Sequence, residues 1–316
     1  MKVYVKTPAR LHFGLIDLNG DLGRMFGGLG VGINRPNVVL EAEQSENLTI
    51  TGEKTEQVKT LAKRFLETYN IKSNVTINVK QVIPEHSGLG SGTQLALAVA
   101  TALAKLFDVK ASVQELAEAM GRGRRTSVGT TIFEQGGFVV DGGKTTSEKR
   151  FPATIFRQPF TLDWSFVVAV PNVGKGLAKS EETAAFKALT PMKSEDAGKM
   201  CRLTMMKLLP ALVERDIEGF GEALTQLQIV IGDYFAEVQG GTYFSQTVSD
   251  GIALLQKLGV HGAGQSSWGP AFYGVTQKEN AKQIEGKVKA FLKKSVGGQV
   301  FTAKANNRGA YIKVTK

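Results

Sequence analysis

The amino-acid sequence predicts an α+β protein of two domains, and two observations support this prediction. Patterns typical of strands and of helices occur in both halves of the chain, which favours helices packed on a sheet in each half. The chain has 316 residues, which is more than a single hydrophobic core usually organises. We place the domain boundary near Pro159, so the predicted domains are residues 1–159 and 160–316.

The first half combines short strands with amphipathic and buried helices. Residues 55–69 carry apolar side chains at helical spacing, and residues 74–83 alternate between polar and apolar, as a half-buried strand does. Residues 94–107 are rich in alanine and leucine on every side, which predicts a buried helix. The other predicted elements are strands at 3–5, 10–17, 38–43, 48–51 and 138–141 and a helix at 112–120.

The second half begins with a continuous apolar strand over residues 165–170. Near the end of the chain, Ile284, Val288, Phe291 and Leu292 share one face of a predicted helix, and lysines occupy its other side. The other predicted elements are helices at 196–214, 217–236 and 246–258 and strands at 271–275, 299–303 and 310–314.

The cysteine content and the length of the apolar runs indicate where in the cell the protein is expected. The chain has one cysteine, Cys201, which forms no internal disulfide, so a reducing cytoplasm fits best. The first residues lack the pattern of a signal peptide, and no apolar run is long enough to cross a bilayer. We therefore expect a cytoplasmic protein that does not span a membrane.

The net charge of +10 is concentrated in residues 278–316, which hold ten lysines and arginines against two glutamates. Such a basic tail leaves open the hypothesis of a nucleic-acid-binding or scaffold protein. No aromatic RNA-binding motif accompanies the lysines, and the solvated face of a helix accounts for them. We therefore favour small molecules as the partners, and neither nucleic acid nor a membrane.

The most informative segment is the glycine-rich run from Pro84 to Gln94, which lies between a predicted strand and a predicted helix. Backbone N–H groups at the start of a helix have no partner within it, and the helix dipole favours an anion there. The segment therefore predicts a phosphate or pyrophosphate site, and an ordinary strand-to-helix turn is the alternative. The residues assigned to this site are Gly88, Gly90, Ser91, Gly92 and Thr93.

Charged residues gather near the start of the chain, where Arg10, His12, Asp17 and Arg24 surround a glycine-rich stretch at 23–30. A charged strand followed by a flexible loop suits substrate binding, although a strand with a simple mobile turn explains it equally well. His12 alternates with apolar neighbours, so the pattern allows it to face either the core or a cleft.

A second basic cluster, at residues 121–130, joins Arg122, Arg124 and Arg125 to glycines and hydroxyl residues. Arginine pairs with phosphate oxygens through two parallel hydrogen bonds, and small neighbours allow a close approach. A solvated basic loop is the alternative. Asp141 follows in another glycine-rich stretch. It is a candidate Mg²⁺ ligand or base, and an ordinary turn aspartate is the alternative.

The last candidate segment is residues 262–270, a run of glycines and serines before a predicted strand. Gly264 and Ser266 are predicted to approach a phosphate or a sugar, and Trp268 offers an aromatic face for a ring. A turn with a partly buried tryptophan is the alternative. The three histidines and the single cysteine are scattered, which excludes a zinc site with the usual spacing.

Together these motifs resemble the GHMP superfamily of small-molecule kinases, which includes galactokinase, homoserine kinase and mevalonate kinase. The phosphate loop of that superfamily reads Pro-x-x-x-Gly-Leu-Gly-Ser-Ser-Ala, and this chain matches it from Pro84 to Ser91. Gly92 stands in place of the second serine, and Thr93 in place of the alanine. In the kinases that second hydroxyl helps to bind the Mg²⁺–nucleotide, so the departure weighs against ATP. The resemblance implies a two-domain GHMP-kinase-like fold.

A narrower resemblance is to the β-ribofuranosylaminobenzene 5′-phosphate synthases, a non-kinase branch of the superfamily. It is carried by residues 9–18, 86–97, 121–129, 133–143 and 307–310. It implies a decarboxylating pentosyltransferase of tetrahydromethanopterin biosynthesis, which joins phosphoribosyl pyrophosphate to 4-aminobenzoate or 4-hydroxybenzoate and releases CO₂ and pyrophosphate. Mg²⁺ and a homodimer are implied, and ATP is not. An ATP-dependent GHMP-type kinase is the alternative function.

The same resemblance gives each cluster an expected role in ribosyl transfer. The glycine-rich loop and Arg122, Arg124 and Arg125 would stabilise the leaving pyrophosphate, with Mg²⁺ near the oxygens of Ser91, Thr93 and Asp141. The candidates for binding the 5′-phosphate are Arg10, Arg24 and Lys175. The expected walls of an apolar aryl pocket are Phe13, Phe26 and Trp268. The candidates for moving a proton are His12, His86 and Asp141.

Overall fold

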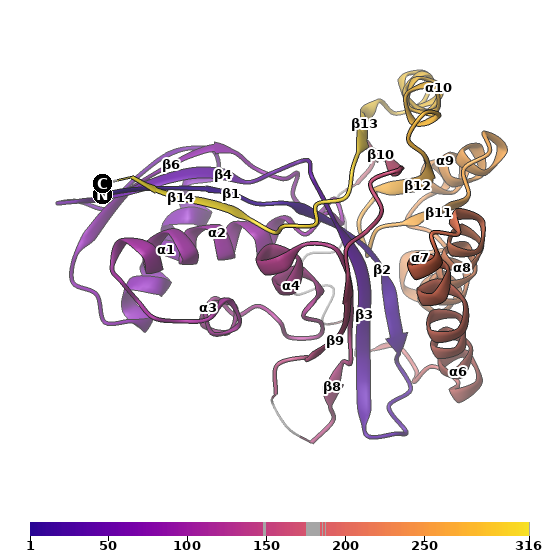
Figure 1. The fold of residues 1–316 in the computed structure, drawn as a ribbon, viewed down its shortest axis with the longest axis horizontal. Coiled ribbons are helices and arrows are strands. Elements are labelled where there is room, and N and C mark those ends of the chain that lie inside the picture. The colour runs from indigo at the N-terminus through magenta and orange to yellow at the C-terminus, as the bar shows by residue number, and fades with distance from the viewer. Residues whose placement is uncertain (148–149, 175–183, 185, 187, 316) are drawn as a thin grey trace.

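The computed structural model describes residues 1–147, 150–174, 184, 186 and 188–315. These residues form three sheets with helices packed around them, so the prediction of an α+β protein is confirmed (Figure 1). The first sheet lies at one end of the molecule, the third lies at the other, and the second runs between them (Figure 1).

The first sheet joins the two ends of the chain. Its last strand pairs antiparallel with its first, so the N- and C-terminal residues lie side by side (Figure 1). Helices cover one face, and α2 is buried on nearly every side, as its alanine and leucine content predicted. The strands, in spatial order, are β14 (Tyr311–Thr315), β1 (Lys2–Lys6), β4 (Val39–Ser45), β6 (Asn74–Gln81) and β5 (Thr49–Gly52). The helices are α1 (Thr55–Thr68), α2 (Ser91–Leu106) and α3 (Val113–Ala119).

The second sheet corrects the prediction of a flexible loop at residues 23–30. Residues 24–30 belong to a long strand, and its glycines give room to close neighbours, since a Cβ on Gly28 would lie 2.9 Å from Thr126. A helix, α4 (Val128–Gln135), which was not predicted from the sequence, packs beside the sheet. The strands are β2 (Ala9–Asp17), β3 (Arg24–Ile33), β7 (Phe138–Asp141) and β9 (Thr154–Gln158), with β8 (Lys144–Thr145) on β3.

The third sheet and its helices form the other end of the molecule. The strand β11 was missed, because the glycines and serines at residues 262–270 suggested only a loop. The strands, in order, are β11 (Gly262–Gln265), β12 (Phe272–Gln277), β10 (Trp164–Pro171) and β13 (Gly298–Ala303). The helices are α6 (Ser194–Leu203), a π-helical turn (Thr204–Leu208), α7 (Leu209–Glu214), α8 (Ile217–Gln239), α9 (Gln246–Lys257) and α10 (Ala281–Lys294).

A chain of buried aromatic rings connects the two halves of the protein. Phe13 of β2 lies 5.2 Å from Tyr273 of β12, and Phe138 of β7 lies 6.1 Å from Phe220 of α8, measured between ring centroids. The division at Pro159 stays a prediction, although β14, from the predicted second domain, lies in the first sheet. None of the helices in the described part of the chain is long and apolar enough to cross a membrane.

Candidate functional site

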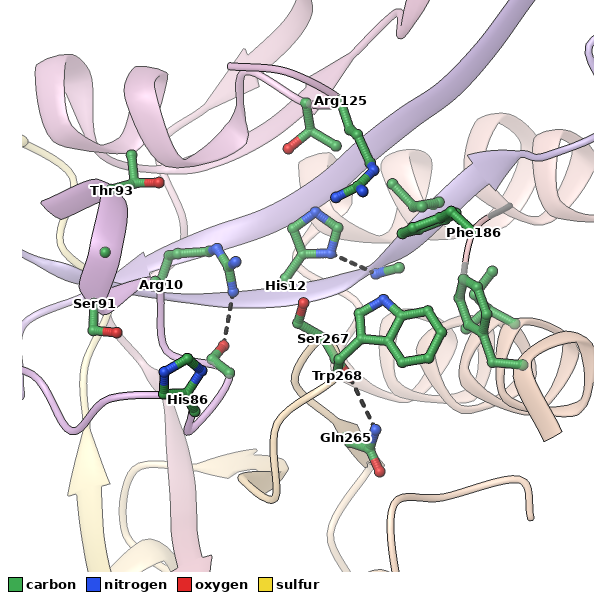
Figure 2. Close-up of a pocket in the computed structure, with 18 of the residues that line it drawn as sticks. Arg10, His12, His86, Ser91, Thr93, Arg125, Phe186, Gln265, Ser267 and Trp268 are labelled. Carbon is green, nitrogen blue, oxygen red and sulfur yellow. Dashed lines mark hydrogen bonds between the residues drawn. The ribbon is translucent and has the colours of Figure 1, made fainter. Parts of the chain in front are cut away.

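A cavity of about 490 Å³ lies where β2, the start of α2 and the C-terminal half of α8 approach one another. Two surfaces of it differ in character. One, the cationic wall, consists of residues 88–93 with Arg10, Arg122, Arg124 and Arg125. The other, the aromatic wall, consists of Phe186, Phe235 and Trp268 (Figure 2).

The cationic wall begins with the glycine-rich turn before α2. Gly90 caps the helix at a φ of +83°, and a Cβ at that position would lie 2.8 Å from the side chain of Arg10. The backbone N–H groups of Ser91 and Gly92 find no acceptor among the described residues. Unpaired N–H groups at the positive end of a helix attract an anion.

Arg122 lies directly against the start of α2. A Cβ on Gly92 would lie 3.1 Å from Nη1 of Arg122, so the absence of a side chain at position 92 makes room for the guanidinium. The Nε atom of Arg122 is buried and has no hydrogen-bond partner in the described structure. Burial lowers the pKa of Arg122, and the charges of Arg64 and Arg124 lower it further. A buried guanidinium among like charges favours an anionic ligand.

Arg10 and Arg125 connect this wall to the rest of the cavity. Arg10 Nη1 donates a hydrogen bond of 2.7 Å to the carbonyl of Gly88 (Figure 2). The guanidinium of Arg125 lies over the ring of Phe186, 4.2 Å from its centroid. Arg125 therefore lies where the cationic wall meets the aromatic wall.

The aromatic wall comes from three segments that are distant in sequence. The rings of Phe235 and Trp268 lie 4.3 Å apart, and Phe186 lies 5.6 Å from Trp268, measured between centroids. Trp268 lies in this wall as expected, whereas Phe13 and Phe26 do not line the cavity. Phe13 is fully buried in the core, and Phe26 packs against Phe186 away from the cavity lining.

Sequence reasoning missed the contribution of α8. Five of its residues line the cavity at the spacing of one helix face, and that spacing was the available signal. The amide of Gln228 links β2 to β11, because its Nε2 donates to the carbonyl of Phe13 and its Oε1 accepts from Gln265 N. The five residues are Gln228, Ile231, Gly232, Phe235 and Gln239.

Gly264 and Ser266 support the site from behind instead of lining it. Ser266 is fully buried, and its Oγ donates to the carbonyl of Gly88 at 2.7 Å and accepts from the N–H of His12 at 3.0 Å. Gly264 packs against the side chain of Gln228, where any Cβ would overlap. Their neighbours Gln265 and Ser267 are the ones that line the cavity.

Asp141 and Arg24 also lie outside the cavity lining. Asp141 is fully buried, and its carboxylate accepts hydrogen bonds of 2.9 Å from the N–H groups of Ser127 and Gly143. Burial raises the pKa of Asp141 to about 6, although these hydrogen bonds oppose the shift. Arg24 donates to the carbonyls of Gly142 and Gly143. Both residues hold loops in place, and neither is positioned to contact a ligand in this cavity.

The two candidate histidines both line the cavity, but in different settings. His12 is buried, and burial lowers its pKa well below the usual value, with a smaller contribution from Arg10. His86 is exposed on the loop before α2 (Figure 2). Lys175, the third candidate for the 5′-phosphate, lies outside the described residues.

Two family models match the chain. One, "GHMP kinases N terminal domain", covers residues 56–137, and the other, "GHMP kinases C terminal", covers residues 208–294. The chain is 32% identical to the beta-ribofuranosylphenol 5′-phosphate synthase of Methanothermobacter thermautotrophicus over 99% of both chains. It is 35% identical to the enzyme of that name from Methanocaldococcus jannaschii, over 96% of this chain and 98% of the other.

The chain belongs to this synthase family of the GHMP superfamily. It is therefore an enzyme of the ribosyl-arene phosphate synthase kind. The GHMP fold is confirmed, since a solved homoserine kinase from Cytophaga hutchinsonii superposes with a TM-score of 0.71 at 17% identity. That superposition covers 99% of this chain and 97% of the kinase.

The oxygens expected to hold Mg²⁺ in this synthase are not gathered in one place. Ser91 and Thr93 line the cavity, whereas Asp141 is buried elsewhere and already accepts backbone hydrogen bonds. Glu85 is the carboxylate on the lining in the described part of the chain, and it is paired with Lys54 at 2.6 Å. No group of three or more acidic, histidine or cysteine side chains suited to a metal occurs among the described residues. Asp141 therefore does not fit the role of a metal ligand.

Proposed function

We propose that this protein condenses phosphoribosyl pyrophosphate with 4-hydroxybenzoate or 4-aminobenzoate, giving a β-ribofuranosyl-arene 5′-phosphate, CO₂ and pyrophosphate. The observation that carries the proposal is the pairing of a cationic wall with an aromatic wall in one cavity. A sugar with two phosphorylated ends and a flat aryl acid match these two surfaces. The relatives named beta-ribofuranosylphenol 5′-phosphate synthase support the same function.

The cationic wall suits departure of the diphosphate. As the bond between ribose C1 and the diphosphate oxygen breaks, negative charge collects on the leaving group, and the sugar takes on oxocarbenium character. A diphosphate bound on the cationic wall would meet the guanidinium of Arg122 and the N–H groups of Ser91 and Gly92, which have no acceptor among the described residues. Preorganised donors of this kind stabilise a transition state more than water does.

The aromatic wall suits the aryl acid. Its ring would stack against Trp268 and Phe235, and the ring carbon that bears the carboxylate would attack ribose C1. A carbon–carbon bond forms there, the bond to the carboxylate breaks, and its electron pair returns to the ring as CO₂ leaves. An apolar surface favours this loss, because a carboxylate is less stabilised there than in water.

The proposal includes Mg²⁺ as a cation bound to the diphosphate, without Asp141 as its ligand. The hydroxyls of Ser91 and Thr93 border the cationic wall, so they can contact a cation that already neutralises the diphosphate. A homodimer and a place in tetrahydromethanopterin biosynthesis remain predictions from the family resemblance.

The test is an incubation of purified protein with phosphoribosyl pyrophosphate, Mg²⁺ and carboxyl-labelled 4-hydroxybenzoate or 4-aminobenzoate, without ATP. We expect labelled CO₂ only when both substrates are present, in equal amount to the pyrophosphate formed. Absence of CO₂ with both acids would contradict the proposal. ATP consumption with a small alcohol would then favour a kinase.

A further inference from the structure

His12 is held in place from several directions. Its backbone N–H donates to Ser266 Oγ at 3.0 Å, and its carbonyl accepts from the N–H of Ser267 at 3.2 Å. Its side chain is 94% buried but still borders the cavity. These hydrogen bonds fix the backbone of His12, and burial limits the positions open to its ring.

The neighbouring Gly14 contacts one edge of the His12 ring. The pairing of β2 with β3 slips by one residue between His12 and Gly14, which is a β-bulge. Gly14 has a φ of +133°, a conformation that other residues rarely adopt. In this conformation its N–H donates to Nδ1 of His12 at 3.3 Å (Figure 2).

This hydrogen bond selects a tautomer. A nitrogen that accepts a hydrogen bond carries no proton, so the proton of the neutral ring must lie on Nε2. Figure 2 shows this second nitrogen on the opposite side of the ring from the Gly14 bond, in the region between Arg10 and Arg125. Burial and the charge of Arg10 disfavour a second proton on the ring.

We propose that Gly14 fixes His12 as the Nε2–H tautomer, and that His12 serves as a neutral hydrogen-bond donor to an anionic oxygen of the substrate. This inference rests on the proposed function for the identity of that substrate. In this tautomer the lone pair of the cavity-facing nitrogen belongs to the aromatic π system of the ring, so His12 does not accept a proton there. Its role is to bind and orient the substrate, in place of the proton transfer expected from the sequence.

The direct test is a nitrogen-15 spectrum of the full-length protein with labelled histidine. The chain has three histidines, so His86→Gln and His261→Gln variants identify the signal of His12. We expect the pattern of a neutral ring protonated at Nε2, unchanged between pH 8 and pH 6. A proton on Nδ1, or a positively charged ring at pH 6, would overturn the proposal. Neither result depends on catalysis.

Substitutions at position 12 then separate a donor from a base. His12→Gln keeps an N–H donor near Nε2 but removes the basic nitrogen, whereas His12→Leu removes both. We expect His12→Gln to retain kcat/KM within about tenfold and His12→Leu to lose about 10²–10³-fold. Equal losses in both variants, with folding intact by circular dichroism, would contradict a donor role. If the wild type releases no CO₂, the proposed function fails while the tautomer result stands.

Discussion

The two walls of the cavity are built by different means. The cationic wall uses backbone N–H groups and arginines from two short stretches, residues 88–93 and 122–125, with Arg10 beside them. The aromatic wall uses side chains alone, and its members Phe186, Phe235 and Trp268 are separated by more than thirty residues in the sequence. Charge recognition can thus be concentrated in local segments, whereas a shaped apolar surface needs distant segments brought together.

Because the two walls differ in chemistry, we expect mutations in them to affect different substrates. A substitution in the cationic wall should change the use of phosphoribosyl pyrophosphate, and one in the aromatic wall should change the use of the aryl acid. Arg125 contacts Phe186, so it belongs to both walls. A substitution of Arg125 should therefore affect the use of both substrates.

The largest effect is expected for Arg122→Ala. Loss of a preorganised donor should lower kcat/KM for phosphoribosyl pyrophosphate by about 10²–10³-fold and change the KM for the aryl acid little. Steady-state kinetics with each substrate varied in turn would measure this. Arg202→Ala is the matched control, because Arg202 is exposed on α6 and outside the cavity lining. An unchanged kcat/KM in Arg122→Ala would remove this residue from the anion site.

A pH effect on stability comes next, from Asp141 behind the cationic wall. Its pKa is about 6 in the folded protein, mainly because of burial, and about 3.8 when exposed. The folded state therefore binds the proton of Asp141 more tightly than the unfolded state does. The contribution of Asp141 to the free energy of unfolding falls as the pH rises from about 3.8 to about 6, and it levels off above that. Between pH 4.5 and 7.5 the wild type should lose about 2 kcal/mol relative to Asp141→Asn.

Urea denaturation of both proteins at these two pH values would measure the change. The other titrating groups contribute equally to the pH dependence of stability in both proteins, since the two proteins differ only at position 141. Their contributions therefore cancel when the two free energies of unfolding are subtracted. A stability difference that does not vary with pH would show that Asp141 titrates outside this interval. It would also weaken its assignment as the buried anchor of Ser127 and Gly143.

The aromatic wall is tested by Trp268→Leu. Loss of the ring contacts with Phe235 and Phe186 should raise the KM for the aryl acid about 5- to 10-fold, with little change in the KM for phosphoribosyl pyrophosphate. The control is Trp164→Leu, since this second tryptophan packs on Phe160 and Phe220 in the core. It should lower the free energy of unfolding by about 3 kcal/mol and leave both KM values unchanged. A similar KM change in both variants would contradict a direct contact.

The smallest effect is expected for Gly92→Ser, which restores the serine of the kinase motif. Its Cβ would lie 3.1 Å from Nη1 of Arg122, so the guanidinium must shift by a few tenths of an ångström. We expect the KM for phosphoribosyl pyrophosphate to rise about threefold, because the charged hydrogen bond is weakened and not lost. Gly198→Ser on α6 is the control, where an added Cβ has open space. A lower KM in Gly92→Ser would mean that Arg122 does not bind this substrate.

Much of the fold could be predicted from local patterns. The helix α1 and the strand β6 repeat apolar residues at the helical and strand period, and α2 and β10 are continuous apolar runs. The missed strands β3 and β11 are rich in glycine, which is typical of loops. Their glycines are required by neighbours distant in sequence, such as Thr126 against Gly28. A local pattern contains no information about such neighbours.

The sequence by itself determined an α+β chain with a glycine-rich helix start and a nearby arginine cluster, since backbone geometry and charge are local properties. Only the tertiary structure decided which polar residues reach the cavity. In the structure Asp141 is buried outside the cavity lining, and Gln265 and Ser267 line the cavity whereas Ser266 does not. Gly14 lies against the ring of His12. The physical reason is that burial, tautomer and wall shape depend on contacts between segments, and packing alone determines those contacts.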